Sequence, residues 1–279
     1  MSNSYDITVA INSYRNAPML RLCIESVCRA TQRCTAQIVV ADSATQEDTY
    51  DMMRQEYPDI EFLPDRKNIG FGAMVNKCLD VAKGEYIFLI NSDTIVREET
   101  IDQLLEYFRA HPDIGVLAPA QLSFTATPLL TCFRFYTPLT ILYRRTPLGR
   151  LPFAQRHLRR FEMRDYDHRN PRTVDWVMGS AMMVRRETVK RVGGMDPQFF
   201  MYMEDVDWCR RFWNAGYSVV YHPGITMYHY YGKGSAGRTL WFTIINRLTW
   251  IHISSAIKYF WKYRTASLPR HDNSVITTS

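Results

Sequence analysis

The stretch Lys83-Gly-Glu-Tyr-Ile-Phe-Leu-Ile-Asn-Ser-Asp-Thr-Ile-Val96 decides the fold of this chain. Its apolar run, residues 86–90, is short and does not alternate with polar residues, which predicts a strand buried on both faces of a mostly parallel sheet. The run ends at Asn91, Ser92 and Asp93, and open α/β sheets bind ligands at the carboxyl ends of such strands. These oxygen-bearing side chains suit a hard divalent cation that also binds substrate phosphates. An Asx turn that ends the strand is the structural alternative.

Alternating strand and helix patterns precede this stretch and are typical of a nucleotide-binding α/β unit. Asp42 falls at the tip of the second strand pattern. Its carboxylate can accept hydrogen bonds from a base or ribose, or it can cap the helix that follows. The expected strands cover residues 7–11, 38–41 and 60–63, and the expected helices cover residues 18–30, 47–57 and 73–82.

Regular patterns continue beyond the central strand. An amphipathic helix is expected at residues 98–111, because its apolar side chains share one face and Pro112 lies just past its end. Residues 173–184 predict a strand pair or one strand with a glycine kink. The other expected elements are strands at residues 116–119, 217–221 and 225–231 and a helix at residues 186–192.

Three acids, Glu204, Asp205 and Asp207, stand at the expected start of a helix that ends near residue 214. The helix dipole favours carboxylates there, so capping accounts for one of them. The neighbouring Phe, Met, Tyr and Trp residues predict partial desolvation, which raises the pKa of a carboxyl group. Such a carboxylate is a usable general base.

His229 ends the last strand pattern, just before Gly232-Lys-Gly-Ser235. A single histidine is usually structural. Before a loop of this composition, however, it can equally contact a metal or a phosphate. The residues alone leave both roles open.

Charge is distributed unevenly. Residues 129–172 hold ten Arg and three acids, residues 236–279 hold six Lys/Arg and one Asp, and the rest of the chain holds 18 Lys/Arg and 24 acids. Two basic attachments on an acidic core indicate an anionic partner, either a membrane surface or phosphates. No helix-turn-helix, RNP-like or zinc-finger pattern accompanies the charge, so nucleic acid is not expected as a partner.

The two basic segments differ in pattern. Residues 125–172 show no clean periodicity, and a stretch of this length inside a domain is usually functional or mobile. Residues 239–263 predict a helix. Arg247 interrupts the apolar run of this helix, so no uninterrupted apolar stretch is long enough to span a membrane. Its three Trp and several basic residues favour a helix lying in the membrane interface, together with the 134–172 segment. Packing of this helix on the catalytic core is the alternative.

The N-terminus and the cysteines bear on location. The first residues lack the basic and apolar regions of a signal peptide, which predicts that the main domain is cytoplasmic. The two basic segments would then place it peripherally at the inner face of the cytoplasmic membrane. The six cysteines form no C-x-x-C pair and have no histidine at zinc-finger spacing. We therefore expect reduced thiols.

Four blocks in this order resemble the inverting family 2 glycosyltransferases of the GT-A fold, particularly the bacterial branch that includes rhamnosyltransferases. The blocks are Ser13-Tyr14 with Asp42, Asn68-Ile-Gly-Phe71 with Asn76, Asn91-Ser-Asp93, and Gly194-Met-Asp-Pro-Gln-Phe-Phe-Met-Tyr-Met-Glu-Asp-Val-Asp-Trp-Cys-Arg-Arg211. The resemblance implies an α/β GT-A catalytic domain over residues 1–235, with a Rossmann-like, mostly parallel central sheet flanked by helices. Residues 236–279 would form a basic, aromatic, amphipathic helical extension.

The resemblance also implies roles for individual residues. Asp205 would be the catalytic base with Glu204 beside it, and Asp93 and His229 would bind Mg²⁺ or Mn²⁺. The implied substrate-binding residues are Ser13, Tyr14, Asp42, Asn68, Gly70, Asn76, Asn91, Ser92, Trp176, Gly179, Asp207 and Arg211.

Three residues depart from the family pattern. Asn91 replaces the Asp that begins the metal motif, which leaves Asp93 as the principal carboxylate. Ser43 stands where an Asn is usual, and Cys78 stands where a Gly is frequent. The last two weaken any assignment of the donor sugar.

The implied reaction is a single inverting displacement. A sugar would pass from a nucleoside-diphosphate sugar, with a lean to dTDP-L-rhamnose, to a hydroxyl of a glycan or polyprenyl-diphosphate-linked acceptor in bacterial surface polysaccharide synthesis. A nucleotidyltransferase would show a Gly-rich loop with Lys after the first strand, and residues 12–16 have none. A non-catalytic sugar-nucleotide-binding subunit would need neither Asp93 nor Asp205.

Overall fold

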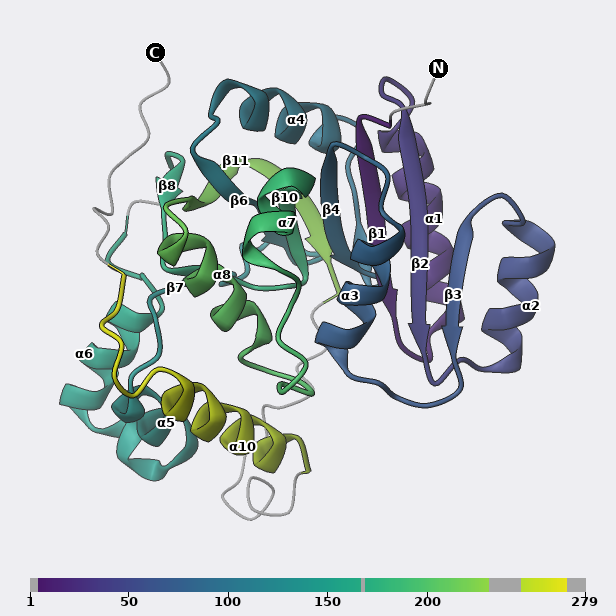
Figure 1. Cartoon of the computed structure of the whole chain (residues 1–279). Coiled ribbons are helices and arrows are strands. Elements are labelled where there is room, and N and C mark those ends of the chain that lie inside the picture. The colour runs from purple at the N-terminus through teal and green to yellow at the C-terminus, as the bar shows by residue number, and fades with distance from the viewer. Residues whose placement is uncertain (1–4, 167–168, 231–246, 270–279) are drawn as a thin grey trace.

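The computed structural model describes residues 5–166, 169–230 and 247–269. A central sheet with helices on both faces forms its body (Figure 1). Within these residues the strand order is β3-β2-β1-β4-β10-β6-β11-β5, with β8 (Arg172–Thr173) beside β11. This is the α/β architecture that the sequence predicts.

The sheet is parallel in its first half and mixed in its second. β1 (Ile7–Ser13), β2 (Ala36–Ser43), β3 (Glu61–Asp65) and β4 (Tyr86–Asn91) all run parallel. The second half holds β10 (Ala181–Arg185), antiparallel to β4 and to β6 (Ile114–Leu122), then β11 (Ser218–His229), parallel to β6, and β5 (Thr94–Ile95), antiparallel to β11. Where two strands were expected, at residues 217–221 and 225–231, the described residues form the single strand β11, with a register shift between His222 and Thr226.

β4 is the doubly buried strand that the sequence predicts. Ile87 and Leu89 belong to the core on one face, and Tyr86, Phe88 and Ile90 belong to the core on the other. The second core contains α1 (Ala17–Ala30), α2 (Glu47–Glu56) and α4 (Thr100–Ala110) side chains. Because both faces are covered, only the strand ends remain available for polar side chains.

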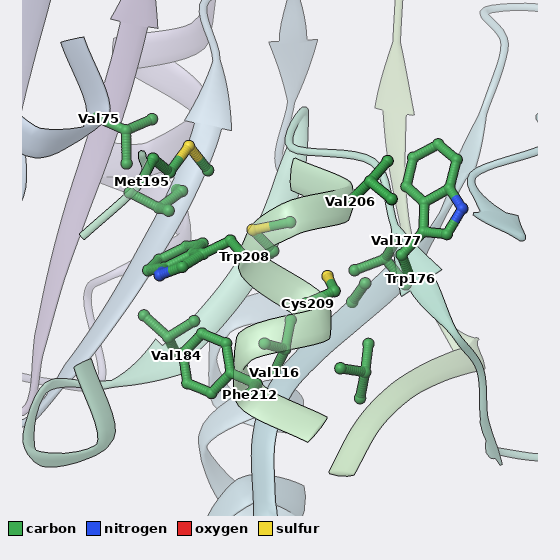
Figure 2. Packing of buried hydrophobic residues seen from close by; sticks show 14 of the residues in the cluster. Val75, Val116, Trp176, Val177, Val184, Met195, Val206, Trp208, Cys209 and Phe212 are labelled. Atoms are coloured by element: carbon green, nitrogen blue, oxygen red, sulfur yellow. The ribbon is translucent and has the colours of Figure 1, made fainter. Parts of the chain in front are cut away.

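The other face of the sheet carries α3 (Phe71–Val81), α7 (Arg186–Val192) and α8 (Glu204–Asn214). Figure 2 shows the side chains of α8 packing against the strands. Trp208 and Phe212 are fully buried there, with their ring centroids 5.2 Å apart. This packing fixes the start of α8 close to the carboxyl end of β4.

The expectation of an irregular segment at residues 125–172 is wrong. It contains β7 (Cys132–Phe133), α5 (Pro138–Arg145), a 3₁₀ turn, η1 (Pro147–Arg150), and α6 (Pro152–Phe161). In α5 and η1, Leu139, Leu142 and Leu148 point to solvent, which hides the helical period there, since amphipathic patterning requires apolar residues on the inner face. The capping box at Thr137, followed by Pro138, is a readable helix start.

The C-terminal helix α10 (Arg247–Lys262) packs on the rest of the molecule. Lys262 Nζ lies 2.6 Å from carboxylate oxygens of both Asp196 and Asp207, and Ser255 Oγ donates to the Met201 carbonyl. The first part of the expected 239–263 helix and the Gly232-Lys-Gly-Ser235 loop lie outside the described residues. Within the described residues, no helix has the length and apolar character needed to cross a bilayer.

Asp207 is the buried centre of these contacts. It is fully buried and accepts hydrogen bonds from Arg211 Nε at 2.8 Å, Lys262 Nζ at 2.6 Å and the Tyr263 hydroxyl at 2.8 Å. Arg211 also donates to the carbonyls of Val192 and Gly194. One carboxylate therefore joins α8, the turn before it and α10.

We predict that Asp207→Asn lowers the free energy of unfolding by about 3 kcal/mol or more, because it leaves the cations around this position uncompensated. Urea unfolding followed by circular dichroism measures the change. Glu187→Gln is the matched control: the Glu187–Arg191 pair is also spaced i,i+4 but is exposed, so its loss should cost under about 1 kcal/mol. Equal losses in the two variants would contradict this role of Asp207.

Candidate active site

Two adjoining cavities lie at the carboxyl ends of the parallel strands. The β1 cavity, about 270 Å³, is lined by Asn12, Ser13, Tyr14, Asn16, Asn68, Met74 and Ser92. The α8 cavity, about 380 Å³, is lined by the start of α8, residues of α5 and α10, and Trp176, Gly179 and His229. Phe71, Asn91, Asp93 and Met201 line both. Asp93 therefore stands where the two cavities meet.

Asp93 faces His229 across the short β5–β11 pairing. His229 Nε2 lies 3.2 Å from Asp93 Oδ1, and Nδ1 lies 2.6 Å from Gln121 Oε1, which also accepts from Ser180 Oγ. Since an amide oxygen can only accept, Nδ1 carries a proton. Nε2 is the ring nitrogen that faces the carboxylate, so the pair presents one nitrogen and one oxygen ligand toward each other and fits a divalent metal site.

This pair leaves coordination positions for a ligand. Among the described residues, no group of three or more His, Cys, Asp and Glu side chains gathers around one point. A hard cation held by one carboxylate and one imidazole keeps room for phosphate oxygens. The Asn91 amide lies at the same strand end.

Asp205 is the carboxylate that reaches the α8 cavity. Its Oδ2 accepts from the Gly179 amide at 3.2 Å and its Oδ1 accepts from the Val206 amide at 2.9 Å. A Cβ at Gly179 would lie 2.7 Å from the Phe71 ring, so only glycine lets this amide approach. Burial raises the pKa of Asp205 well above its ordinary value, and the two amides offset part of that shift.

Glu204 is buried more deeply than Asp205. It is 5% exposed, and its Oε2 has no hydrogen-bond partner among the described residues. Burial, and then the charge of Asp205, raise the pKa of Glu204. In the described part of the chain, Glu204 Oε2 also lacks a donor of the kind that the two backbone amides give the Asp205 carboxylate. Glu204 is therefore the protonated member of the pair near neutral pH.

The backbone before α8 is strained. Tyr202 and Met203 both have φ of +68°, a conformation that side chains other than glycine rarely adopt. Both line the α8 cavity. Consecutive strained residues of this kind cluster at functional sites, where the surrounding packing holds them.

Aromatic side chains form another wall of the α8 cavity. Trp176 stacks on Phe133 and Tyr136, with centroid distances of 4.6 and 5.6 Å. Its indole N–H donates to the Arg134 carbonyl. A flat apolar surface beside two carboxylates is suited to binding one face of a sugar ring.

Many of the expected site residues converge here. Ser13, Tyr14, Asn68, Asn91, Ser92 and Asp93 line the β1 cavity, and Trp176, Gly179, Glu204, Asp205 and His229 line the α8 cavity. Asp42 lies beneath the β1 cavity, fully buried beside Ser13 and Thr45, and burial raises its pKa. Neither of its carboxylate oxygens has a well-formed hydrogen bond among the described residues.

Four other expected substrate-binding residues line neither cavity. Asn76 donates to the Met195 carbonyl and accepts from the Met195 amide, each at 2.8 Å, so it holds the turn before α8. Asp207 and Arg211 form the buried pair already described. Gly70 has φ of +86°, and a Cβ there would meet the Phe200 carbonyl at 2.3 Å, so it serves chain packing. In this structure, therefore, the side chains of Asn76, Asp207 and Arg211 contact the chain around the site, and Gly70 lies in the turn before α3.

Sequence reasoning missed other residues of the α8 cavity. Tyr136, Arg144 and Arg145 come from the segment expected to be irregular, and His252 comes from α10. For the two arginines, the only indication in the sequence was the net positive charge of their segment. His252 had none, because its place in the cavity depends on how α10 docks.

Comparisons with known proteins identify the family of this chain. A family model described as "Glycosyltransferase like family 2" matches residues 5–252. The chain belongs to this family. It is therefore a glycosyltransferase, as the four sequence blocks predict.

Sequence relatives of this glycosyltransferase include rhamnosyltransferases. An N-acetylglucosaminyl-diphospho-decaprenol L-rhamnosyltransferase of Mycobacterium tuberculosis is 28% identical over 243 residues, covering 80% of this chain and 76% of the relative. Rhamnosyltransferase WbbL of Escherichia coli is 46% identical over 57 residues, covering 20% and 22% of the two chains. The protein is thus rhamnosyltransferase-like.

Solved structures share the GT-A fold. A mannosyltransferase from Pyrobaculum calidifontis, in complex with GDP-Man and Mn²⁺, aligns with a TM-score of 0.57 at 15% identity, covering 96% of this chain and 78% of the other. GalNAc-T7 with UDP, GalNAc and Mn²⁺ aligns with a TM-score of 0.61 at 15% identity, covering 96% and 59%. At this identity the likeness establishes the fold.

We predict that Asp205→Asn lowers kcat for transfer by about 100-fold or more, while Glu204→Gln stays within about tenfold of the parent enzyme. A glutamine amide resembles the protonated acid that Glu204 already is, whereas an asparagine amide in place of Asp205 cannot accept a proton. Steady-state assays with donor and acceptor distinguish the two. If Glu204→Gln lowered kcat more than Asp205→Asn, Glu204 would be the base in place of Asp205.

The pH dependence follows from the same burial. The base acts when deprotonated, so kcat/KM should fall as pH drops through the raised pKa of Asp205. We expect an acid limb well above the usual Asp value of about 3.9. A limb at or below pH 4 would contradict Asp205 as the base.

Proposed function

We propose that this protein is a metal-dependent inverting glycosyltransferase that uses a nucleoside-diphosphate sugar, with dTDP-L-rhamnose as the first candidate. The acceptor is a hydroxyl of a lipid-linked or glycan saccharide in the assembly of bacterial surface polysaccharide. One observation carries this proposal: Asp93 and Asp205, far apart in the chain, line one cavity. The rhamnosyltransferase relatives support the sugar and the carrier.

Each wall of the site has a role in this reaction. The β1 cavity, with Ser13, Tyr14 and Asn68, receives the nucleoside, and Asp93 with His229 holds Mg²⁺ or Mn²⁺ at the donor diphosphate. When bound, such an ion offsets the negative charge of the leaving nucleoside diphosphate. The aromatic wall of the α8 cavity receives the acceptor sugar.

Asp205 then acts as the base. It accepts the proton of the acceptor hydroxyl as the oxygen attacks the anomeric carbon from the face opposite the leaving group. The Gly179 and Val206 amides hold the Asp205 carboxylate in place, and burial keeps the pKa of Asp205 raised. A binding subunit without catalysis would need no such buried base, which favours the enzyme over that alternative.

A panel of UDP-, dTDP- and GDP-sugars with Mn²⁺ tests the donor by thermal shift, because a ligand that binds only the native state raises the melting temperature. We predict the largest shift with a dTDP-sugar, dependent on metal. Asp93→Asn should remove most of this shift, whereas Asp205→Asn should keep it. A shift unaffected by EDTA or by Asp93→Asn would contradict the metal site.

The surface formed by α5, η1, α6 and α10, here called the basic platform, supports membrane docking of this enzyme. These elements lie together on one side of the molecule (Figure 1). Its exposed apolar side chains are Leu139, Leu142, Leu148, Leu151, Phe153, Trp250, Ile257 and Trp261, and its exposed basic ones include Arg150, Arg156, Arg159 and Arg160. We propose that the platform binds the anionic inner leaflet, which places the enzyme at the cytoplasmic face of the membrane.

Packing and membrane contact are compatible for α10. Its inner face buries His252, Ala256 and Tyr259, while Trp250 and Trp261 are 57% and 69% exposed. The alternatives that the sequence left open therefore concern different faces of one helix. Outward tryptophans beside arginines are typical of interfacial helices.

Flotation with liposomes tests the docking. We predict that the protein floats with anionic vesicles at low salt, and that Trp250→Ser with Trp261→Ser, or Gln at Arg156, Arg159 and Arg160, removes most of the bound fraction. Leu22→Ser, on the exposed face of α1, is the matched control and should float as the parent does. Flotation unchanged by the platform substitutions would contradict docking through it.

A further inference from the structure

Two adjacent arginines of α5, Arg144 and Arg145, line the same cavity as Asp205. Arg145 is partly buried, and Arg144 lies at the rim. The donor-side residues Ser13 and Asn68 line the other cavity. The arginines therefore line the cavity that holds Asp205 and lie outside the β1 cavity.

Arg145 is fixed by a side chain from α10. Its Nε donates to His252 Nδ1 at 3.1 Å, and its second guanidinium nitrogen also reaches that atom. Burial, and then the charges of Arg145 and Arg144, lower the pKa of His252 to about 3. The imidazole thus stays neutral and acts as an acceptor, which holds the guanidinium without cancelling its charge.

Arg144 is fixed by aromatic side chains. It donates to the Tyr136 hydroxyl, and its guanidinium carbon lies 5.8 Å from the Tyr136 ring centroid and 5.6 Å from that of Phe161. These contacts hold the planar group at the cavity mouth and leave its positive charge uncompensated.

Neither arginine has a carboxylate partner within the described parts of the chain. Arg21, Arg191 and Arg211 each bond to one, so pairing is common elsewhere in this protein. Burial, and then the charge of Arg144, lower the pKa of Arg145, which is the sign of a cation held at a cost. Two guanidinium groups that are held in place and bonded to no carboxylate of the described chain match a phosphate-bearing ligand.

We propose that Arg144 and Arg145 bind the diphosphate of the acceptor, so that the enzyme recognises a saccharide diphosphate rather than a neutral sugar. This inference rests on the proposed function. The inference extends the proposed function, because it places the diphosphate of the acceptor against α5 and the acceptor sugar between the arginines and Asp205. His252 is a positioning residue that acts through Arg145.

The fold connects this site to the basic platform. α5 supplies the arginines, α10 supplies His252, and both helices carry the exposed apolar side chains of the platform. A lipid esterified to the bound diphosphate would leave the cavity beside these side chains. Docking of α10 thus completes the acceptor site.

Direct binding tests the proposal without turnover. The probes are octyl N-acetylglucosaminyl diphosphate and octyl N-acetylglucosaminide, titrated calorimetrically with EDTA present so that no metal at Asp93 contributes. We expect the diphosphate to bind at least tenfold more tightly than the glycoside. Arg144→Gln and Arg145→Gln should each remove about tenfold of that preference, because each loses a charge-assisted hydrogen bond.

Arg164→Gln is the matched control for charge. Arg164 belongs to the same basic segment but is exposed, pairs with Glu162 and lies outside the cavity. It should leave the preference for the diphosphate unchanged. Circular dichroism and the donor thermal shift with Mn²⁺ establish that each variant is folded and binds donor.

Two substitutions test His252 as a positioning residue. His252→Leu removes the acceptor for Arg145 and should weaken diphosphate binding about as much as Arg145→Gln, with glycoside binding unchanged. His252→Asn restores an acceptor oxygen and should recover most of the affinity. If His252 had only a structural role, both substitutions would weaken the binding of both probes, and His252→Asn would bind them no better than His252→Leu.

Three outcomes would overturn the proposal. The first is equal affinity of the parent enzyme for the two probes, and the second is a loss of preference in Arg164→Gln as large as in Arg145→Gln. The third is a loss of the donor thermal shift in the Arg144 and Arg145 variants, which would show that these arginines bind the donor. The proposed function fails separately, if no nucleotide sugar shifts the melting temperature of the parent. The two failures are therefore distinguishable.

Discussion

The buried carboxylate of Asp207 is the constraint on which the arrangement of the site depends. It is fully buried and bonded to Arg211, Lys262 and Tyr263. Because an unpaired charge in this position is costly, the turn before α8 and the C-terminal helix are held to one geometry. That geometry sets the strained residues Tyr202 and Met203 against the cavity. It also brings His252 from α10 to Arg145 of α5.

Three acids within four residues acquire three functions because their environments differ. Asp207 faces cations and serves structure, Glu204 is enclosed without a partner, and Asp205 reaches the cavity while two backbone amides hold it. The helical period turns successive residues by about 100°, so adjacent positions on α8 face different surroundings. Burial raises the pKa of both Glu204 and Asp205, but the hydrogen bonds of Asp205 keep it the stronger acid.

The site combines two sources of positive charge. Asp93 and His229 suit a cation at the junction of the cavities, where the donor diphosphate is proposed to lie. Arg144 and Arg145 provide fixed charge in the α8 cavity, where the acceptor diphosphate is proposed to bind. If both substrates carry phosphates, as proposed, the reaction needs both anions neutralised. The exposed platform beside the arginines would then face the proposed lipid carrier.

Local signals in the sequence determined the framework. The uninterrupted apolar run before Asn91 requires a strand buried on both faces, and the glycines, prolines and apolar periods around it fixed α1, α3, α4 and α7 to within a few residues. The Asn91-Ser-Asp93 and Glu204-Asp-Val-Asp207 motifs correctly indicated polar groups at strand and helix ends. These features depend on residues adjacent in the chain, so a single sequence contains them.

Tertiary structure alone decided which of those groups share a cavity. Asn76 and Arg211 belong to motifs but turn toward the backbone of the 192–195 turn, whereas Arg145 and His252 belong to no motif and meet in the cavity. The helical elements of residues 138–150 were obscured because their leucines face solvent. Contacts between residues more than a hundred positions apart depend on how α8 and α10 pack on the sheet. Packing of that kind leaves no periodic trace in either segment.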